Sequence, residues 1–165
     1  LYLTLISAIE SAETEVRITM AYFVPHEELL AALKAAVRRG VDVKLVLPGR
    51  TDHWLVFHAG RSYYEELLEA GVQIFERESR LLHSKTAIVD GVWSTVGSTN
   101  LDWRSLIHND EINAVVLGTE FAAALGAIFE RDLANSRAIT LESWRGRPAG
   151  DRIREASARA WALLL

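Results

Sequence analysis

The sequence predicts an α/β domain built on a mixed, mainly parallel sheet with helices on both of its faces. Two helical patterns that end in a glycine, at Gly40 and Gly71, are each followed directly by an apolar strand pattern. Such helix-then-strand units place consecutive strands side by side in a parallel sheet. Asp90-Gly91 separates two further strand patterns and is a strong signal for an antiparallel hairpin. We therefore expect an α/β domain over residues 1–140, followed by a basic amphipathic C-terminal tail over residues 141–165.

The first part of the chain alternates helix and strand. Residues 4–13 repeat apolar side chains at helical spacing, and residues 16–20 alternate as a strand does before Pro25. Apolar side chains recur at helical spacing over residues 29–37, namely Leu29, Leu30, Leu33, Ala36 and Val37. Residues 41–47 are almost continuously apolar, which predicts a strand that is buried on both faces.

The second part begins with a polar loop that carries Asp52 and leads to a helix that includes Tyr64 and ends at Gly71. One short strand is expected directly after Gly71, and three more over residues 86–89, 92–96 and 111–117. A last helix is expected to begin with Thr119 as its N-cap. Its predicted core face carries Phe121, Leu125, Ile128, Phe129 and Leu133.

Composition excludes several classes of protein. Half of the residues are hydrophobic and 24% are charged, which is typical of a folded domain and not of a disordered chain. The chain has no cysteine, so disulfides and cysteine metal sites are excluded. The net charge of −4 argues against a broad nucleic-acid-binding surface. Five arginines against three acidic residues give residues 142–165 a net charge of +2, which leaves −6 for the remainder.

Two features concern the ends of the chain. The longest wholly apolar run, residues 160–165, is far shorter than the ~18 residues that cross a bilayer. The chain begins at Leu1 without an initiator Met. We therefore expect it to be part of a longer protein whose targeting segments lie elsewhere.

The most informative stretch runs from His83 to Asn100. His83 and Lys85 are two residues apart on an extended segment, so their side chains point to the same face, and Ser98 and Asn100 repeat this spacing. The predicted hairpin folds the second pair back beside the first. An imidazole, an ammonium, a hydroxyl and an amide then lie together, a set that suits a phosphoryl group. The histidine can attack phosphorus or protonate a leaving oxygen, while the other groups donate hydrogen bonds to the non-bridging oxygens.

The spacing of His83, Lys85, Asp90, Ser98 and Asn100 resembles the signature motif of the phospholipase D superfamily. In that motif a His-x-Lys pair and an aspartate precede a Gly-Ser-x-Asn segment. Further stretches resemble the C-terminal half of bacterial cardiolipin synthases, namely residues 22–25, 61–66, 97–105 and 108–113. The resemblance covers most of residues 20–118 and implies a phospholipase D-like fold for the α/β domain.

The resemblance also implies how the site works. In the superfamily two such motifs face each other, one histidine becomes a covalent phosphohistidine, and the other protonates the leaving alcohol. This chain contains one motif, so the second is expected from an N-terminal domain of the same protein or from a homodimer mate. His83 is then expected to be the general acid, or to fill both roles if the chain pairs with itself. The resemblance names Glu111 as the carboxylate that hydrogen-bonds the histidine ring, and it makes Asp90 mostly structural, so we rank Asp90 below the other candidates.

The function implied is that of a cardiolipin synthase-like phosphatidyltransferase, which forms cardiolipin from two phosphatidylglycerols. The phospholipid substrate implies a membrane surface and a place at the bacterial cytoplasmic membrane, with the membrane segments outside this fragment. We expect no cofactor and no metal, since the ammonium of Lys85 beside His83 would repel a cation.

Two alternatives remain open. The first is a phospholipase D-type phosphodiesterase, either a lipid hydrolase or a nuclease, that acts as a homodimer. The negative charge disfavours a nucleic-acid partner. The second is a non-catalytic domain that completes a partner's site. The presence of the whole set of candidate residues weighs against this reading.

The C-terminal tail contains a second amphipathic pattern. One helical face carries Ile153, Ala156, Ala160, Trp161 and Leu164, while Arg152 and Arg159 lie elsewhere. This pattern fits a helix at a membrane surface. The alternatives are packing against the protein's own domain and a frayed end.

Overall fold

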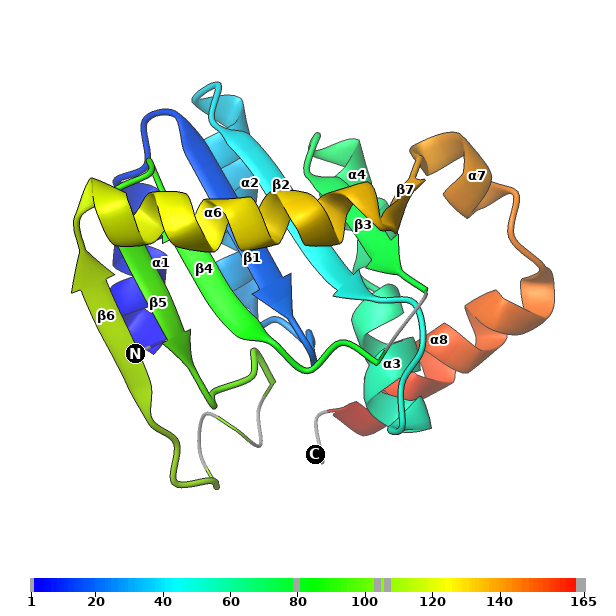
Figure 1. Cartoon of the computed structure of the whole chain (residues 1–165). Coiled ribbons are helices and arrows are strands. Elements are labelled where there is room, and N and C mark those ends of the chain that lie inside the picture. Colours follow the sequence, from blue (N-terminus) through cyan, green and yellow to red (C-terminus); the bar gives the residue numbers. More distant parts are fainter. Residues whose placement is uncertain (1, 79–80, 103–104, 106–107, 163–165) are drawn as a thin grey trace.

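The computed structural model describes residues 2–78, 81–102, 105 and 108–162. Its centre is a sheet of seven strands in the order β6-β5-β4-β1-β2-β3-β7 (Figure 1). The strands are β1 (Glu15–Met20), β2 (Asp42–Pro48), β3 (Gln73–Arg77), β4 (Lys85–Val89), β5 (Trp93–Gly97), β6 (Asn113–Leu117) and β7 (Ser136–Ile139).

The sheet is mixed, as expected, but parallel pairing does not dominate it. Only β1–β2 and β2–β3 pair in parallel, and the other four pairings are antiparallel. The two helix-then-strand units build the parallel centre. The hairpin then adds antiparallel strands on one side, and β7 returns antiparallel to β3 on the other. The prediction of a mainly parallel sheet was therefore wrong in this detail. Helix-then-strand units indicate parallel pairing for the central strands β1, β2 and β3, but not for the strands on either side of them.

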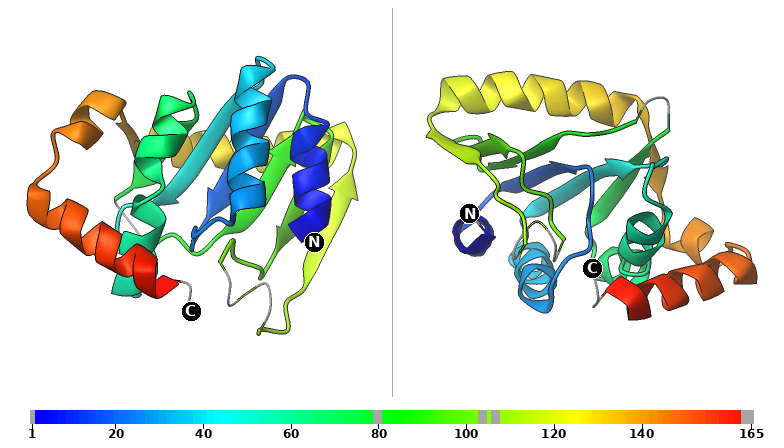
Figure 2. Two further views of the ribbon diagram at one scale, coloured as in Figure 1. Left: turned by 180° about the vertical axis from the view of Figure 1, so that it is seen from behind. Right: turned by 90° about the horizontal axis from the view of Figure 1, so that it is seen from below.

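Helices cover both faces of the sheet, which confirms the predicted class (Figure 2). Among the described helices, α6 crosses one face, and α1 and α2 lie on the other (Figures 1 and 2). The described helices are α1 (Tyr2–Glu10), α2 (Glu27–Arg38), α3 (Trp54–Arg61), α4 (Tyr64–Glu69), α6 (Thr119–Ala134), α7 (Leu141–Arg145) and α8 (Ala149–Ala162). None of these described helices is long and apolar enough to cross a membrane.

The larger part of the core lies between the sheet and the helices α1 and α2, where Ile9, Ile18 and Leu33 are fully buried. On the opposite face α6 covers two smaller clusters, around Phe129 and around Leu125. The single helix α6 therefore shields only a narrow strip of its face.

The helix α6 differs from its prediction in two respects. Its N-cap is Gly118, and Thr119 is already the first helical residue. Leu125 and Phe129 are buried as expected, but Phe121 and Ile128 are exposed. Because α6 contacts only a narrow strip of the sheet, the outer members of a wide apolar face remain in solvent.

The segment between β2 and β3 forms two helices where one was expected, with α3 preceding α4. The two helices are separated near Ser62, whose hydroxyl donates to the carbonyl of Ala59 at 2.6 Å. Gly60 of α3 packs directly on the backbone carbonyl of Phe23, and a Cβ at this position would collide with it. This contact fixes α3 against the chain that leaves β1.

The C-terminal helix α8 packs against α3. It turns Glu155 and Ala158 inward and leaves Ile153 67% and Trp161 61% exposed. The face predicted as the apolar stripe of the tail therefore points outward, while Leu164 lies outside the described residues.

Candidate active site

One edge of the sheet gathers most of the candidate residues. The carboxyl ends of β1, β2 and β5 meet there with the beginnings of β4 and β6 (Figure 1). His83 lies just before β4, Ser98 just after β5, and Glu111 just before β6. Met20 pairs with Lys85 and Gly97 pairs with Asn113, so the antiparallel register brings these strand ends together.

Lys85 is the buried charge of this edge, with 8% of the residue exposed. Its Nζ donates a hydrogen bond to the carbonyl of His83 at 2.9 Å and lies 6.0 Å from the centre of the Tyr22 ring. Burial lowers the pKa of Lys85 from its ordinary value, and nearby carboxylates oppose the shift, among them Glu111 and Asp102. The opposing carboxylates favour the ammonium form that a phosphate would need.

His83 is exposed at the same edge. Its ring meets the ring of Tyr22 in an edge-on arrangement, with the ring centres 6.2 Å apart and the planes at 79°. His83 and Lys85 thus both contact Tyr22, in agreement with the prediction that their side chains share a face.

Ser98 and Asn100 lie on the segment that leaves β5. The Ser98 hydroxyl accepts a hydrogen bond from the amide of Ile112 at 3.0 Å. Asn100 is buried, its Nδ2 donates to the Ser105 hydroxyl at 3.4 Å, and its Oδ1 has no hydrogen-bond partner among the described residues. A buried acceptor and a weakly engaged donor leave the Asn100 amide able to take up further hydrogen bonds.

Two close approaches hold this segment in place. The amide of Leu101 donates to the carbonyl of Tyr22 at 3.1 Å, and the amide of Val24 donates to the carbonyl of Leu101 at 2.7 Å. At Gly97 a Cβ would collide with the side chain of Asn113 and the carbonyl of Ile112. The segment is therefore fixed between the chain that leaves β1 and the chain that enters β6.

Glu111 affects the site by the electrostatic effect of its carboxylate on Lys85. Its Oε1 accepts a hydrogen bond from the Asn109 amide at 3.4 Å, and its carboxylate opposes the lowering of the Lys85 pKa. The hydrogen bond to the His83 ring that the resemblance implies is not formed within the described part of the chain. Asn109, two residues away, donates to the Glu111 carboxylate instead.

Asp90 lies apart from the other candidates, at the opposite end of β4. Its carboxylate accepts hydrogen bonds from the amides of Glu13, Thr14 and Glu15 and from the Thr14 hydroxyl, at 2.8 to 3.0 Å. The five residues of β4 lie between Asp90 and His83, about 17 Å of extended chain. This geometry fits the structural role that the resemblance implied for Asp90, and it does not bring Asp90 to the other candidate residues.

Sequence reasoning missed Tyr22 and Asp52 as residues of this edge. The Tyr22 hydroxyl donates a hydrogen bond to Asp52 Oδ1 at 2.8 Å. Both residues follow parallel strands, and the carboxyl ends of parallel strands are where α/β proteins place their sites. That rule could have pointed to both residues. Among the described residues, no group of three or more His, Asp or Glu side chains is arranged to hold a metal ion.

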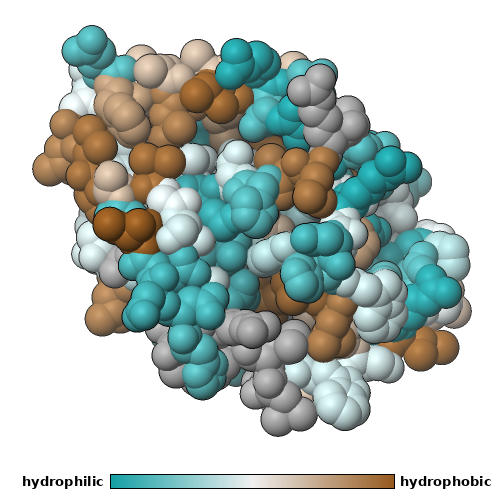
Figure 3. All heavy atoms as spheres, turned by 60° about the horizontal axis from the view of Figure 1, so that its bottom comes forward, coloured by the Kyte–Doolittle hydropathy of each residue, from teal (hydrophilic) through white to brown (hydrophobic). Residues whose placement is uncertain are grey.

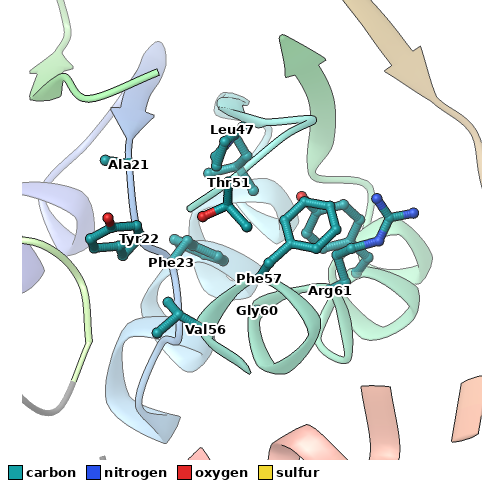
Figure 4. A pocket seen from close by; sticks show the side chains of 11 residues that line it. Ala21, Tyr22, Phe23, Leu47, Thr51, Val56, Phe57, Gly60 and Arg61 are labelled. Atoms are coloured by element: carbon teal, nitrogen blue, oxygen red, sulfur yellow. The ribbon is translucent and has the colours of Figure 1, made fainter. Parts of the chain in front are cut away.

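A small pocket lies beside Tyr22, between the ends of β1 and β2 and the helix α3 (Figure 4). The space that a water-sized sphere can enter in it is about 20 Å³, and most of its walls are apolar, including Phe23, Leu47 and Phe57. Figure 4 shows Tyr22 at one end of the pocket and Arg61 at the other. Tyr22 therefore separates an apolar pocket from the polar edge that carries His83.

A broader groove of about 750 Å³ runs along the other side of this edge. It lies between the start of α1 and the chain that enters β6, and Thr99, Ser105 and Glu111 contribute to its walls. Of the candidate residues, Glu111 therefore faces an open groove on the side of β6.

The comparison with known families gives one assignment. The family described as "Cardiolipin synthase, PLD-like domain" matches residues 5–133. The cardiolipin synthase of Halalkalibacterium halodurans is 42% identical over 96% of this chain and 32% of its own length. Cardiolipin synthase A of Proteus mirabilis is 44% identical over 92% of this chain and 31% of its own length. The chain thus spans about a third of these relatives.

Solved structures share the fold. Nuc from Salmonella typhimurium, a phospholipase D family member, superposes with a TM-score of 0.72 at 27% identity, over 84% of this chain and 90% of its own. The phosphatidylserine synthase of Haemophilus influenzae gives a TM-score of 0.71 at 12% identity, over 99% of this chain and 42% of its own. At that identity the second likeness concerns the fold alone.

Proposed function

Because this chain belongs to the family of cardiolipin synthase phospholipase D-like domains, we propose that it supplies one half of the active site of a phosphatidyltransferase. The reaction is the transfer of a phosphatidyl group from one phosphatidylglycerol to a second, which forms cardiolipin and releases glycerol. The observation that carries the proposal is the gathering of His83, Lys85, Asn100 and Glu111 at one edge of the sheet.

In this proposal the histidine of the second half attacks the phosphorus of the first phosphatidylglycerol. A phosphorus–nitrogen bond forms, the bond to the glycerol oxygen breaks, and His83 gives its proton to that oxygen. The hydroxyl of the second phosphatidylglycerol then attacks the same phosphorus and gives its proton to His83, while the phosphorus–nitrogen bond breaks. Lys85 and Asn100 donate hydrogen bonds to the non-bridging oxygens as charge develops on them.

The second half of the site comes from an N-terminal domain of the same protein or from a second copy of the chain. The length of the relatives supports the first source, since this chain spans about a third of them. The edge strand β6 supports an interface beside the site, because Ile112 is 81% exposed and Val115 and Leu117 also face solvent. Apolar residues gather on the left of Figure 3, the side on which Figure 1 shows β6.

We place the reaction at the surface of the bacterial cytoplasmic membrane, where the phospholipid substrate resides. The outward face of α8 supports contact with that surface. Its exposed Ile153 and Trp161 are accompanied by the exposed arginines Arg152, Arg154 and Arg159. Apolar side chains flanked by arginines suit the interface of a membrane with anionic lipids.

A second candidate function is hydrolysis, in which water takes the place of the second phosphatidylglycerol. The likeness to Nuc favours it, because this chain covers 90% of that phospholipase D family member. A domain of this size would then work as a pair of identical chains. The net charge of −4 disfavours a nucleic acid as the phosphodiester substrate.

The test replaces His83 by alanine in the full-length protein and supplies phosphatidylglycerol in mixed micelles. We expect H83A to lower the rate of cardiolipin formation at least ~100-fold, since general acid–base catalysis contributes about that much. The control H26Q changes a histidine on the loop before α2 and should retain the parental rate. Cardiolipin with equimolar glycerol identifies the transferase, whereas phosphatidic acid identifies the hydrolase. A parental rate in H83A would show that His83 does not take part.

A further inference from the structure

Tyr22 lies between the two groups that would act on the phosphate. The pairing of β1 with β4 ends at Met20 and Lys85, and the same register continued for two residues sets Tyr22 opposite His83. The Tyr22 ring meets the His83 ring edge-on at 6.2 Å between centres. The Lys85 ammonium lies 6.0 Å from the centre of the same ring. One aromatic ring therefore contacts both groups.

The hydroxyl of Tyr22 is directed away from the phosphoryl-binding set. It donates to Asp52 Oδ1 at 2.8 Å, on the loop between β2 and α3. Burial first, and then the hydrogen bond to Asp52, raise the pKa of Tyr22 to about 12, so the hydroxyl stays protonated at neutral pH. An occupied hydroxyl that keeps its proton is poorly suited to exchange protons with a substrate, so Tyr22 acts through its ring.

Further contacts fix Tyr22 through its backbone and its ring. The Tyr22 carbonyl accepts a hydrogen bond from the amide of Leu101 at 3.1 Å, next to Asn100. The ring of His53 also meets the Tyr22 ring, with centres 5.3 Å apart. Tyr22 is thus fixed by its hydroxyl, by its backbone and by a ring contact. The His83 ring is exposed, and it packs edge-on against the Tyr22 ring.

We propose that Tyr22 is a positioning residue, whose ring sets the orientation of the His83 imidazole and the place of the Lys85 ammonium, and that Asp52 holds this ring through its hydroxyl. The proposal rests on the proposed function, in which His83 transfers a proton and Lys85 binds the phosphoryl group. Aromatic rings prefer such edge-on contacts, and an ammonium is attracted to a tyrosine ring. A misoriented imidazole would slow proton transfer without preventing lipid binding.

Three variants of the full-length enzyme test the proposal. Y22L removes the ring, Y22F keeps the ring and removes the hydroxyl, and D52A removes the acceptor. We expect Y22L to lower kcat about tenfold or more while KM changes less than about twofold. Y22F and D52A should resemble each other and fall between Y22L and the parent. The control F121L changes an exposed aromatic residue on α6, across the sheet, and should keep the parental kcat.

A second readout does not depend on the reaction. In NMR spectra of the 165-residue chain, the ring protons of His83 should shift in Y22L, because the ring current of Tyr22 is lost, and should stay unchanged in F121L. If Y22L does not fold, the same two readouts on Y22F and D52A decide the proposal. Parental kcat together with parental His83 resonances in these variants would overturn it. In a further outcome, the His83 resonances shift in Y22L, but the parental full-length enzyme transfers no phosphatidyl group. This outcome would overturn the proposed function and support the positioning of His83 by Tyr22.

Discussion

Asp90 joins the turn between β4 and β5 to the beginning of β1. Its backbone has a φ of +52°, a left-handed conformation that aspartate tolerates better than most residues, and Gly91 follows with a φ of +61°. Its carboxylate accepts four hydrogen bonds from residues 13–15. The aspartate of the motif therefore ties together two strands that are far apart in sequence, and β4 carries Lys85 at its other end.

The variant D90A should be destabilised. It leaves the amides of residues 13–15 without their acceptor, and we expect the free energy of unfolding to fall by about 2 kcal/mol at pH 7, measured by urea denaturation. The exposed carboxylate of Asp110 supplies the control, since D110A should stay within about 0.5 kcal/mol of the parent. Equal losses in D90A and D110A would show that the four hydrogen bonds do not stabilise the turn.

Asp90 also makes the free energy of unfolding depend on pH in the acidic range. Burial alone would raise its pKa, but the hydrogen bonds from Glu15, Glu13 and Thr14 outweigh burial and hold the pKa of Asp90 below its ordinary value of 3.8. The stabilisation is therefore complete above pH 3.8 and is lost as the pH falls through the lower pKa of the folded state. D90N should lose this part of the acid dependence.

At the scale of single elements, the helix α8 has one face packed against the domain and one face exposed to solvent. Glu155 and Ala158 face α3, and Ile153 and Trp161 face solvent. The apolar stripe that the sequence pattern marks is exposed. The helix is instead held to the domain on its other face, where the buried Glu155 lies near Arg61 and Arg147. The domain leaves the apolar stripe of α8 uncovered, as the proposed membrane contact requires.

The outward face of α8 can be tested with lipid vesicles. We expect the chain to cosediment with phosphatidylglycerol vesicles more than with phosphatidylcholine vesicles, because the arginines favour an anionic surface. The double variant I153S/W161S should lower the apparent affinity about tenfold or more, since two buried apolar side chains are lost. S157A, which changes an exposed residue of the same helix, is the matched control. Equal binding of the parent and the double variant would rule out this contact.

Elements were predictable where a local pattern specifies them. The Asp90-Gly91 hairpin and the strands that follow Gly40 and Gly71 were located from sequence, because turn chemistry and apolar runs are properties of neighbouring residues. The face of α6 was predicted less well, since the sequence marks a wide apolar stripe and only the sheet beneath it decides that Phe121 and Ile128 stay exposed.

At the scale of the whole molecule, a buried network of charges joins the C-terminal segment to the sheet. Glu76 on β3 accepts hydrogen bonds from Arg61 at 2.8 Å and from Arg137 at 3.0 Å. Glu155 on α8 accepts two from Arg147, at 3.0 and 2.9 Å, and lies 3.6 Å from Arg61. Arg61 on α3 thus connects the sheet with the last helix.

Breaking this network should loosen the C-terminal segment. E155A removes the buried carboxylate that pairs with Arg147 and leaves that partly buried guanidinium with the more distant Glu65 carboxylate, 3.8 Å away, while Arg61 keeps Glu76. We expect the free energy of unfolding to fall by about 3 kcal/mol. The control D151A removes the half-buried partner of the exposed Arg154, 3.2 Å away on the same helix, and should cost less than about 1 kcal/mol. Urea denaturation compares the two, and trypsin should cleave within α8 fastest in E155A. Parental stability of E155A would mean that α8 docks without this charge.

The sequence by itself determined the family to which this chain belongs. The His-x-Lys pair and the Gly-Ser-x-Asn segment are local patterns, and their spacing across a predictable hairpin was enough to identify the family and most of the residues at the candidate site. These features depend on neighbours along the chain, so they can be derived without coordinates.

Only the tertiary structure decided which distant segments meet. The register between β1 and β4 places Tyr22 beside His83 and Asp90 at the far end of the strands. The outermost strands, β6 and β7, pair antiparallel with their neighbours. These contacts join residues tens of positions apart. No periodicity in the sequence encodes them, because they follow from how the strands and helices pack together.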